Sequence, residues 1–76
     1  MSRVDYYVVP LRSAWAIRLN NKHFGPCTSQ RVATDVAISA AKKAIIEGCL
    51  PRVLVFDGGH FRIAWEARRQ GKTVAA

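Results

Sequence analysis

The fold is decided by residues 29–48, which read SQRVATDVAISAAKKAIIEG. Thr28 or Ser29 suits an N-cap, because its hydroxyl can accept a hydrogen bond from a free backbone N–H of the first helical turn. Neither Gly nor Pro interrupts the stretch before Gly48, which suits a left-handed C-cap, and Pro51 follows soon after. This pattern predicts one long helix.

The expected helix is amphipathic, with an apolar stripe that consists largely of alanine. The stripe repeats every four residues and is widened by two more alanines, so that its members are Val32, Val36, Ala40, Ala44, Ala33 and Ala37. Polar residues gather on the opposite side, which predicts that one face of the helix lies on a sheet. Because alanine is small, we expect the helix axis to approach the sheet closely.

Strands are expected on both sides of the helix. The expected strands are 5–11, which is aromatic and β-branched, the alternating ranges 14–19 and 61–66, the apolar range 52–56, and the short range 22–25, which Gly25-Pro26 closes. Asn20-Asn21 and residues 57–60 (DGGH) are signals for tight hairpins. The sequence therefore predicts an α+β fold of order β-β-β-α-β-β, in which a single antiparallel sheet has one long helix packed on one face. Residues 1–67 are expected to form one compact domain, and residues 68–76 a flexible basic C-terminal tail.

Two of these strands alternate between apolar and polar residues, which assigns their faces. The apolar sets expected against the helix are Trp15, Ile17 and Leu19 in one strand, and Phe61, Ile63 and Trp65 in the other. Arg18 and Arg62 are then expected on the open face of the sheet, where they can contact phosphates or guanine edges. The alternative is that both pair with acids across strands, with Glu66 and Asp5 respectively.

Tyr6 and Tyr7 lie on opposite faces of the first strand. One of them is expected in the core. The other can stack on a nucleic-acid base or simply favour strand formation, and the sequence leaves open which tyrosine is exposed.

The chain is strongly basic, with 12 Lys and Arg against 5 Asp and Glu and a formal net charge of +7. Residues 1–67 hold nine of the basic residues and all five acids, which leaves +4. Such a balance is typical of proteins that neutralise phosphates. The candidate nucleic-acid-binding residues, taken from the strands, their ends and the tail, are Arg12, Arg18, Lys22, Arg52, Arg62, Arg68, Arg69 and Lys72.

No catalytic or metal-binding pattern stands out. His23 and His60 have no partner at a defined spacing, and Cys27 and Cys49 flank a helix too long for a disulfide to span. We therefore expect no catalytic residues, no metal and no cofactor. No stretch approaches the roughly 20 apolar residues of a membrane span. We expect no signal peptide, because the first residues do not show the pattern of a charged region, an apolar region and a cleavage site. A cytoplasmic protein that is not an enzyme, with no membrane or small-molecule partner, is expected.

The order of short motifs along residues 5–66 carries a resemblance. These motifs are Tyr7-Val8-Val9-Pro10, Trp15-Ala16-Ile17, a Thr/Ser cap before an alanine-rich helix, Val53-Leu54-Val55 and Asp57-Gly58-Gly59. Together they resemble a small bacterial domain family of unknown function, which implies the fold and no activity. Residues 14–44 are less closely similar to the three-strand-plus-helix DNA-binding domains of phage integrase arms and plant transcription factors. In that pattern, strands present arginines to the major groove.

Two functions remain open from the sequence. The first is a nucleic-acid-binding module with little sequence preference, which uses arginines on the open sheet face and the basic tail. The alternative is a protein-interaction or homodimerisation module. It is motivated by Ile38, Ile45 and Ile46, which lie outside the main helical stripe and cannot all face one sheet.

Overall fold

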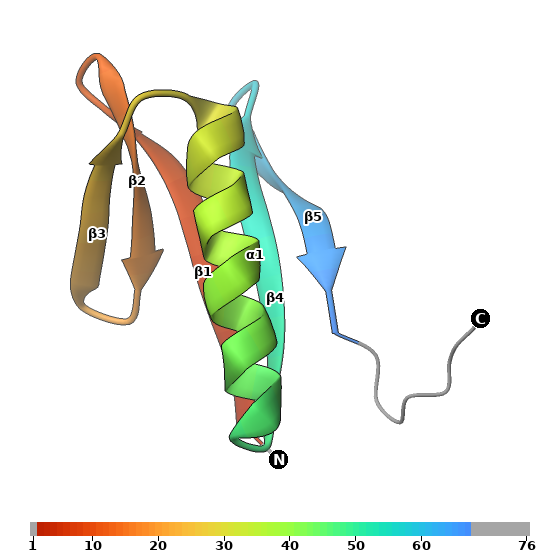
Figure 1. Cartoon of the computed structure of the whole chain (residues 1–76). Helices are drawn as coiled ribbons and strands as arrows, with labels where there is room; N and C mark the ends of the chain where they lie inside the picture. The colour runs from red at the N-terminus through yellow and green to blue at the C-terminus, as the bar shows by residue number, and fades with distance from the viewer. Residues whose placement is uncertain (1, 68–76) are drawn as a thin grey trace.

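The computed structural model describes residues 2–67 and shows one helix packed on one face of a five-stranded sheet (Figure 1). The elements are β1 (Ser2–Leu11), β2 (Ala14–Leu19), β3 (Lys22–Cys27), α1 (Gln30–Ile46), β4 (Cys49–Asp57) and β5 (His60–Glu66). The α+β class and the order β-β-β-α-β-β are confirmed. The expected tail, residues 68–76, lies outside the described residues. Within residues 2–67, α1 is too short and too polar to cross a membrane.

The sheet is mixed, which corrects the prediction of a purely antiparallel sheet. Its strand order is β3-β2-β1-β4-β5, and β1 runs parallel to β4 whereas the other neighbours are antiparallel. The reason is topological. The β1–β2–β3 meander leaves β3 parallel to β1, and α1 then returns the chain so that β4 starts in the same direction as β3. Parallel neighbours require such a crossover, and here it places β1 at the centre of the sheet.

The core consists of alanines from α1 and larger apolar residues from the sheet. Ser29 is the N-cap, and its side chain accepts a hydrogen bond of 3.2 Å from the backbone N–H of Val32. The buried core residues are Tyr6, Val8, Ile17, Ala33, Ala37, Ala41, Val53 and Val55. Figure 1 shows α1 lying along β1 and β4, with β3 and β5 to either side.

The buried stripe of α1 centres on Ala33, Ala37 and Ala41, and not on the predicted valines. Val32 and Val36 remain 43% and 48% exposed. The helix lies over β1 and β4, so that its flank toward β3 has less sheet beneath it. An apolar groove of about 240 Å³ follows this flank, and its lining residues are Tyr6, Ile17, Leu19, Phe24, Val36 and Ala40.

A β-bulge in β5 changes which side chains face the helix. Val53 of β4 pairs with Trp65, and the next residue, Leu54, pairs with Ile63, so that Ala64 of β5 has no partner in β4. An extra residue of this kind inverts the alternation of side chains beyond it. Trp65 therefore packs against the core, whereas Phe61 and Ile63 lie on the opposite face. The prediction that all three share one face is wrong for this reason.

β4 begins three residues earlier than predicted and contains Pro51, which was expected to lie outside it. Pro51 is fully buried, and its carbonyl accepts a hydrogen bond of 3.0 Å from the backbone N–H of Ala67. In an antiparallel pair of this kind the two residues normally exchange two backbone hydrogen bonds, but proline has no N–H and cannot donate the second one. The last paired position is therefore Arg52 with Glu66, and β5 ends there.

Several local predictions agree with the structure. Asn20 has a φ of 58° in the two-residue turn between β2 and β3. Trp15 packs partly buried against the core, and Cys27 and Cys49 are free, half-buried thiols.

Replacing Ala37 with leucine is expected to lower the free energy of unfolding by about 1–3 kcal/mol, because added methyl groups overpack a fully buried contact. Ala40→Leu is the matched control, since the same change there projects into the apolar groove. Urea denaturation followed by tryptophan fluorescence measures both variants. Equal losses in the two variants would contradict the close contact between α1 and the sheet.

Candidate nucleic-acid interface

The open face is the face of the sheet opposite α1. A row of side chains runs across its five strands. The strand register places one residue of each strand in this row: His23, Arg18, Tyr7, Leu54 and Ile63, from β3 to β5 in spatial order. Tyr6 lies on the other face, in the core. The structure thus identifies Tyr7 as the tyrosine of the open face.

Three aromatic rings form a contiguous group on the open face, the aromatic patch, which consists of Tyr7, Phe56 and Phe61. The ring of Phe61 meets Tyr7 edge-to-face at a centroid distance of 5.1 Å and meets Phe56 in the same way at 5.3 Å. Phe61 is 40% exposed, and Ile63 beside it is also exposed. This patch was not predicted from the sequence, because the alternation in β5 assigns Phe61 to the helix side. Only the bulge places it here.

Arg18 lies at the edge of the aromatic patch. Its guanidinium carbon is 5.2 Å from the centroid of the Tyr7 ring, a cation–π contact. The alternative pairing with Glu66 does not occur, and Arg18 has no acidic partner among the described residues. A cation–π contact uses none of the five N–H donors of the guanidinium group. Arg18 therefore retains its capacity to bind the oxygens of a phosphate.

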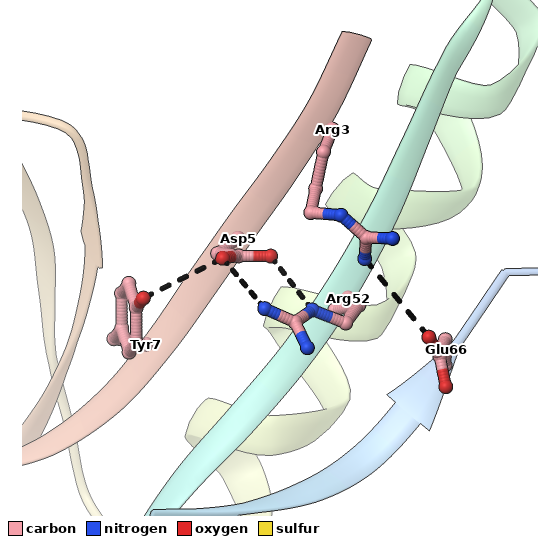
Figure 2. Close-up of polar contacts among 5 residues, drawn as sticks. All are labelled: Arg3, Asp5, Tyr7, Arg52 and Glu66. Atoms are coloured by element: carbon pink, nitrogen blue, oxygen red, sulfur yellow. Dashed lines mark hydrogen bonds and ion pairs between the residues drawn. The ribbon is translucent and has the colours of Figure 1, made fainter. Parts of the chain in front are cut away.

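A polar network surrounds the first half of β1 on the open face (Figure 2). Arg52 donates from Nε and Nη2 to the two carboxylate oxygens of Asp5, at 2.9 and 3.0 Å. The hydroxyl of Tyr7 donates to Asp5 Oδ2 at a distance of 3.5 Å, and Arg3 Nη1 lies 4.0 Å from Glu66 Oε2. The hydrogen bond from Arg52 lowers the pKa of Asp5, and the same bond raises the pKa of Arg52. Much of the charge of Arg52 is thus compensated.

Arg62 does not lie on the open face, which corrects the prediction. It pairs in register with Val55, a core residue that faces α1, and its Nε donates to Asp57 Oδ2 at 3.2 Å. The bulge at Ala64 is the cause, because it inverts the faces of the residues that precede it in β5. The expected alternative, a pair between Arg62 and Asp5, is also absent, since Asp5 binds Arg52.

The other predicted contact residues are only partly brought together. Arg18 and Arg52 share the open face. Lys22 lies opposite Leu19 and so belongs to the helix side, and Arg12 is exposed in the turn between β1 and β2. The predicted tail residues lie outside the part that the structure describes: Arg68, Arg69 and Lys72. Arg3, which was not predicted, joins the open face.

The two halves of the open face differ in character. Residues 6–34, which include β2, β3 and most of β1, contain no Asp or Glu, and their basic residues are Arg12, Arg18, Lys22 and Arg31. In β4 and β5, by contrast, two arginines are balanced by two acids: Arg52, Arg62, Asp57 and Glu66. The open face therefore has a basic half on β1 and β2, where Arg3 and Arg18 lie, and an aromatic half on β4 and β5, and the two halves meet at Tyr7. The acid-free run was visible in the sequence, but its position beside the rings was not.

A hollow of about 340 Å³ lies where the two halves meet. Its lining residues are Arg3, Val4, Asp5, Tyr7, Arg18 and Asn20. Two guanidinium groups from different strands border it, and the Asp5 carboxylate is already bonded to Arg52. The hollow can therefore accept an anionic group such as a phosphate. Within residues 2–67, no three His, Cys, Asp or Glu side chains lie close enough together to hold a metal ion.

Comparisons with protein-family models, with curated proteins and with solved structures found no match. The function of the open face is therefore inferred from its geometry and charge.

Asp5→Asn is expected to lower the free energy of unfolding at neutral pH by about 1–2 kcal/mol, a value between those of exposed and fully buried ion pairs. The pKa of Asp5 is lowered in the folded state by Arg52. Its contribution is thus complete above the unfolded pKa of about 3.9 and is lost as the pH falls through the lower folded pKa. The difference in the free energy of unfolding between wild type and variant should be constant above about pH 5 and become smaller below about pH 4.

Urea denaturation at a series of pH values measures this difference. A difference that stays the same down to about pH 2 would show that the charge of Asp5 does not contribute to stability.

Proposed function

We propose that this domain binds nucleic acid through the open face of its sheet. The observation that carries the proposal is the position of Arg18, which has no acidic partner among the described residues and lies against the aromatic patch. A guanidinium group supplies affinity for phosphate, and exposed rings supply a surface for bases. The net charge of +7 gives the whole chain a field that attracts polyanions.

The residues of the open face have different roles in this proposal. Arg18 binds phosphate directly. Arg3 adds a second contact, because its ion pair with Glu66 is long and exposed and is therefore easily exchanged for a phosphate. Arg52 mainly orients Asp5 and contributes less. The tail residues Arg68, Arg69 and Lys72 add charge as an electrostatic arm, as the sequence suggested.

A second candidate function is protein interaction or homodimerisation through the helix side. It is supported by apolar side chains that α1 and β3 leave exposed, namely Phe24, Val32, Val36, Ile45 and Ile46, of which Ile46 is 86% exposed. Ile38 no longer supports this function, because it packs against the core. Light scattering at micromolar concentration separates the two functions. The protein-interaction function would be favoured by a dimer that does not bind nucleic acid and that dissociates when Val36 is replaced by Asp.

Arg18→Ala is expected to weaken binding of a labelled oligonucleotide by about three- to tenfold and to reduce the salt slope of binding by about one. The matched control is Arg31→Ala, which removes the same charge from an exposed position on α1. It should have a smaller effect. Fluorescence anisotropy at low salt measures both variants. If wild-type protein does not bind, or if both variants lose affinity equally, the open face is not the binding surface.

Asp5→Asn is expected to strengthen binding by about two- to fivefold, because it removes a negative charge from the open face and releases Arg52 for phosphate contact. Asp35→Asn makes the same charge change on the exposed side of α1 and is the control. The same titrations, made at several salt concentrations, compare the two. A gain that is equal in both variants would indicate a general effect of net charge and no specific role for this face.

A further inference from the structure

Phe61 is the most exposed ring of the aromatic patch and is held from two sides. Tyr7 and Phe56 both contact it edge-to-face, with interplanar angles of 71° and 67°. Its orientation is therefore fixed before any partner arrives, while 40% of its surface remains exposed. Ile63, the next open-face residue along β5, is also exposed and extends the apolar surface. An exposed, oriented ring of this kind is a platform on which a planar group can stack.

The guanidinium group of Arg18 lies one ring away from this platform. The Tyr7 ring contacts both groups: its centroid is 5.1 Å from that of Phe61 and 5.2 Å from the guanidinium carbon of Arg18. The hollow bordered by Arg3 and Arg18 continues the basic side along β1. One nucleic-acid strand can therefore place a base on Phe61 and, at the same time, the phosphate of the same or the next nucleotide on Arg18. The aromatic half and the basic half match the two chemically different sides of a single strand.

We infer that the open face selects single-stranded nucleic acid, with a base stacked on Phe61 and the phosphates on Arg18 and Arg3. This inference rests on the proposed function and names its ligand. In a duplex the flat faces of the bases are stacked on one another and the phosphates face outward. A duplex would therefore place charged phosphates against the apolar side chains of Phe61 and Ile63. In a single strand the bases can turn toward the rings. The charge complementarity of Arg18 and Arg3 for phosphate makes a nucleic acid the occupant, rather than an apolar protein surface.

The experiment uses the full chain and three labelled probes of about 15 nucleotides: oligothymidine, an abasic strand of the same length, and a duplex. The abasic strand retains the phosphates and lacks the bases, so its affinity reports charge alone. Wild-type protein is expected to bind oligothymidine about tenfold more tightly than the abasic strand. Phe61→Ala is expected to remove this preference and to leave the abasic affinity unchanged. Phe24→Ala, which truncates a similarly exposed ring on the helix side, is the matched control and should retain the preference.

Phe61→Leu keeps apolar bulk against Phe56 and tests the same point if Phe61→Ala proves unstable; it should also lose the base preference. Oligouridine in place of oligothymidine distinguishes RNA from DNA, and a base preference with either supports the inference. Equal binding of oligothymidine, abasic strand and duplex overturns the inference and leaves the proposed function in place. Failure to bind any probe overturns both. A base preference that survives in both Phe61 variants also overturns the inference.

Discussion

The contact between the alanines of α1 and the valines of β1 and β4 is the constraint on which the rest of the structure depends. Ala33, Ala37 and Ala41 are fully buried against Val53 and its neighbours. Because alanine methyl groups form the centre of the helical side of this contact, the helix lies close to the sheet and covers a narrow strip of it. Each buried valine contributes about 1.5–3 kcal/mol, so a small domain depends strongly on these few contacts.

A narrow strip of contact leaves the edges of the sheet uncovered. On the helix side, β2 and β3 extend beyond α1 and leave the apolar groove lined by Phe24 and Val36. On the open face, no second layer within residues 2–67 covers the sheet (Figure 1). The side chains of that face therefore have to be stable in water or have a partner. Tyr7, Phe56 and Phe61 partly cover one another, and the proposed stacking on Phe61 would cover more.

The open face combines a stabilising ion pair with a cation that has no acidic partner among the described residues. Asp5 accepts two hydrogen bonds from Arg52 and so stabilises the parallel pairing of β1 with β4, at the position where these two residues lie side by side. The same carboxylate reduces the affinity of the face for anions. Arg18 is held by Tyr7 without neutralisation of its charge. Stability and the proposed binding thus draw on different arginines, and Asp5 sets the balance between them.

The sequence by itself determined the elements, their order and an N-cap at Thr28 or Ser29, because helix periodicity, capping and turn residues act over a few neighbouring positions. The structure identifies Ser29 as that cap. It also determined the acid-free run that makes β2 and β3 basic. Only the tertiary structure decided the parallel pairing of β1 and β4, which joins residues far apart in the chain, and the bulge at Ala64, which depends on how β5 pairs with β4. A single extra residue in β5 reverses every side chain that precedes it, and alternation alone contains no sign of it. That reversal removed Arg62 from the open face and placed Phe61 there.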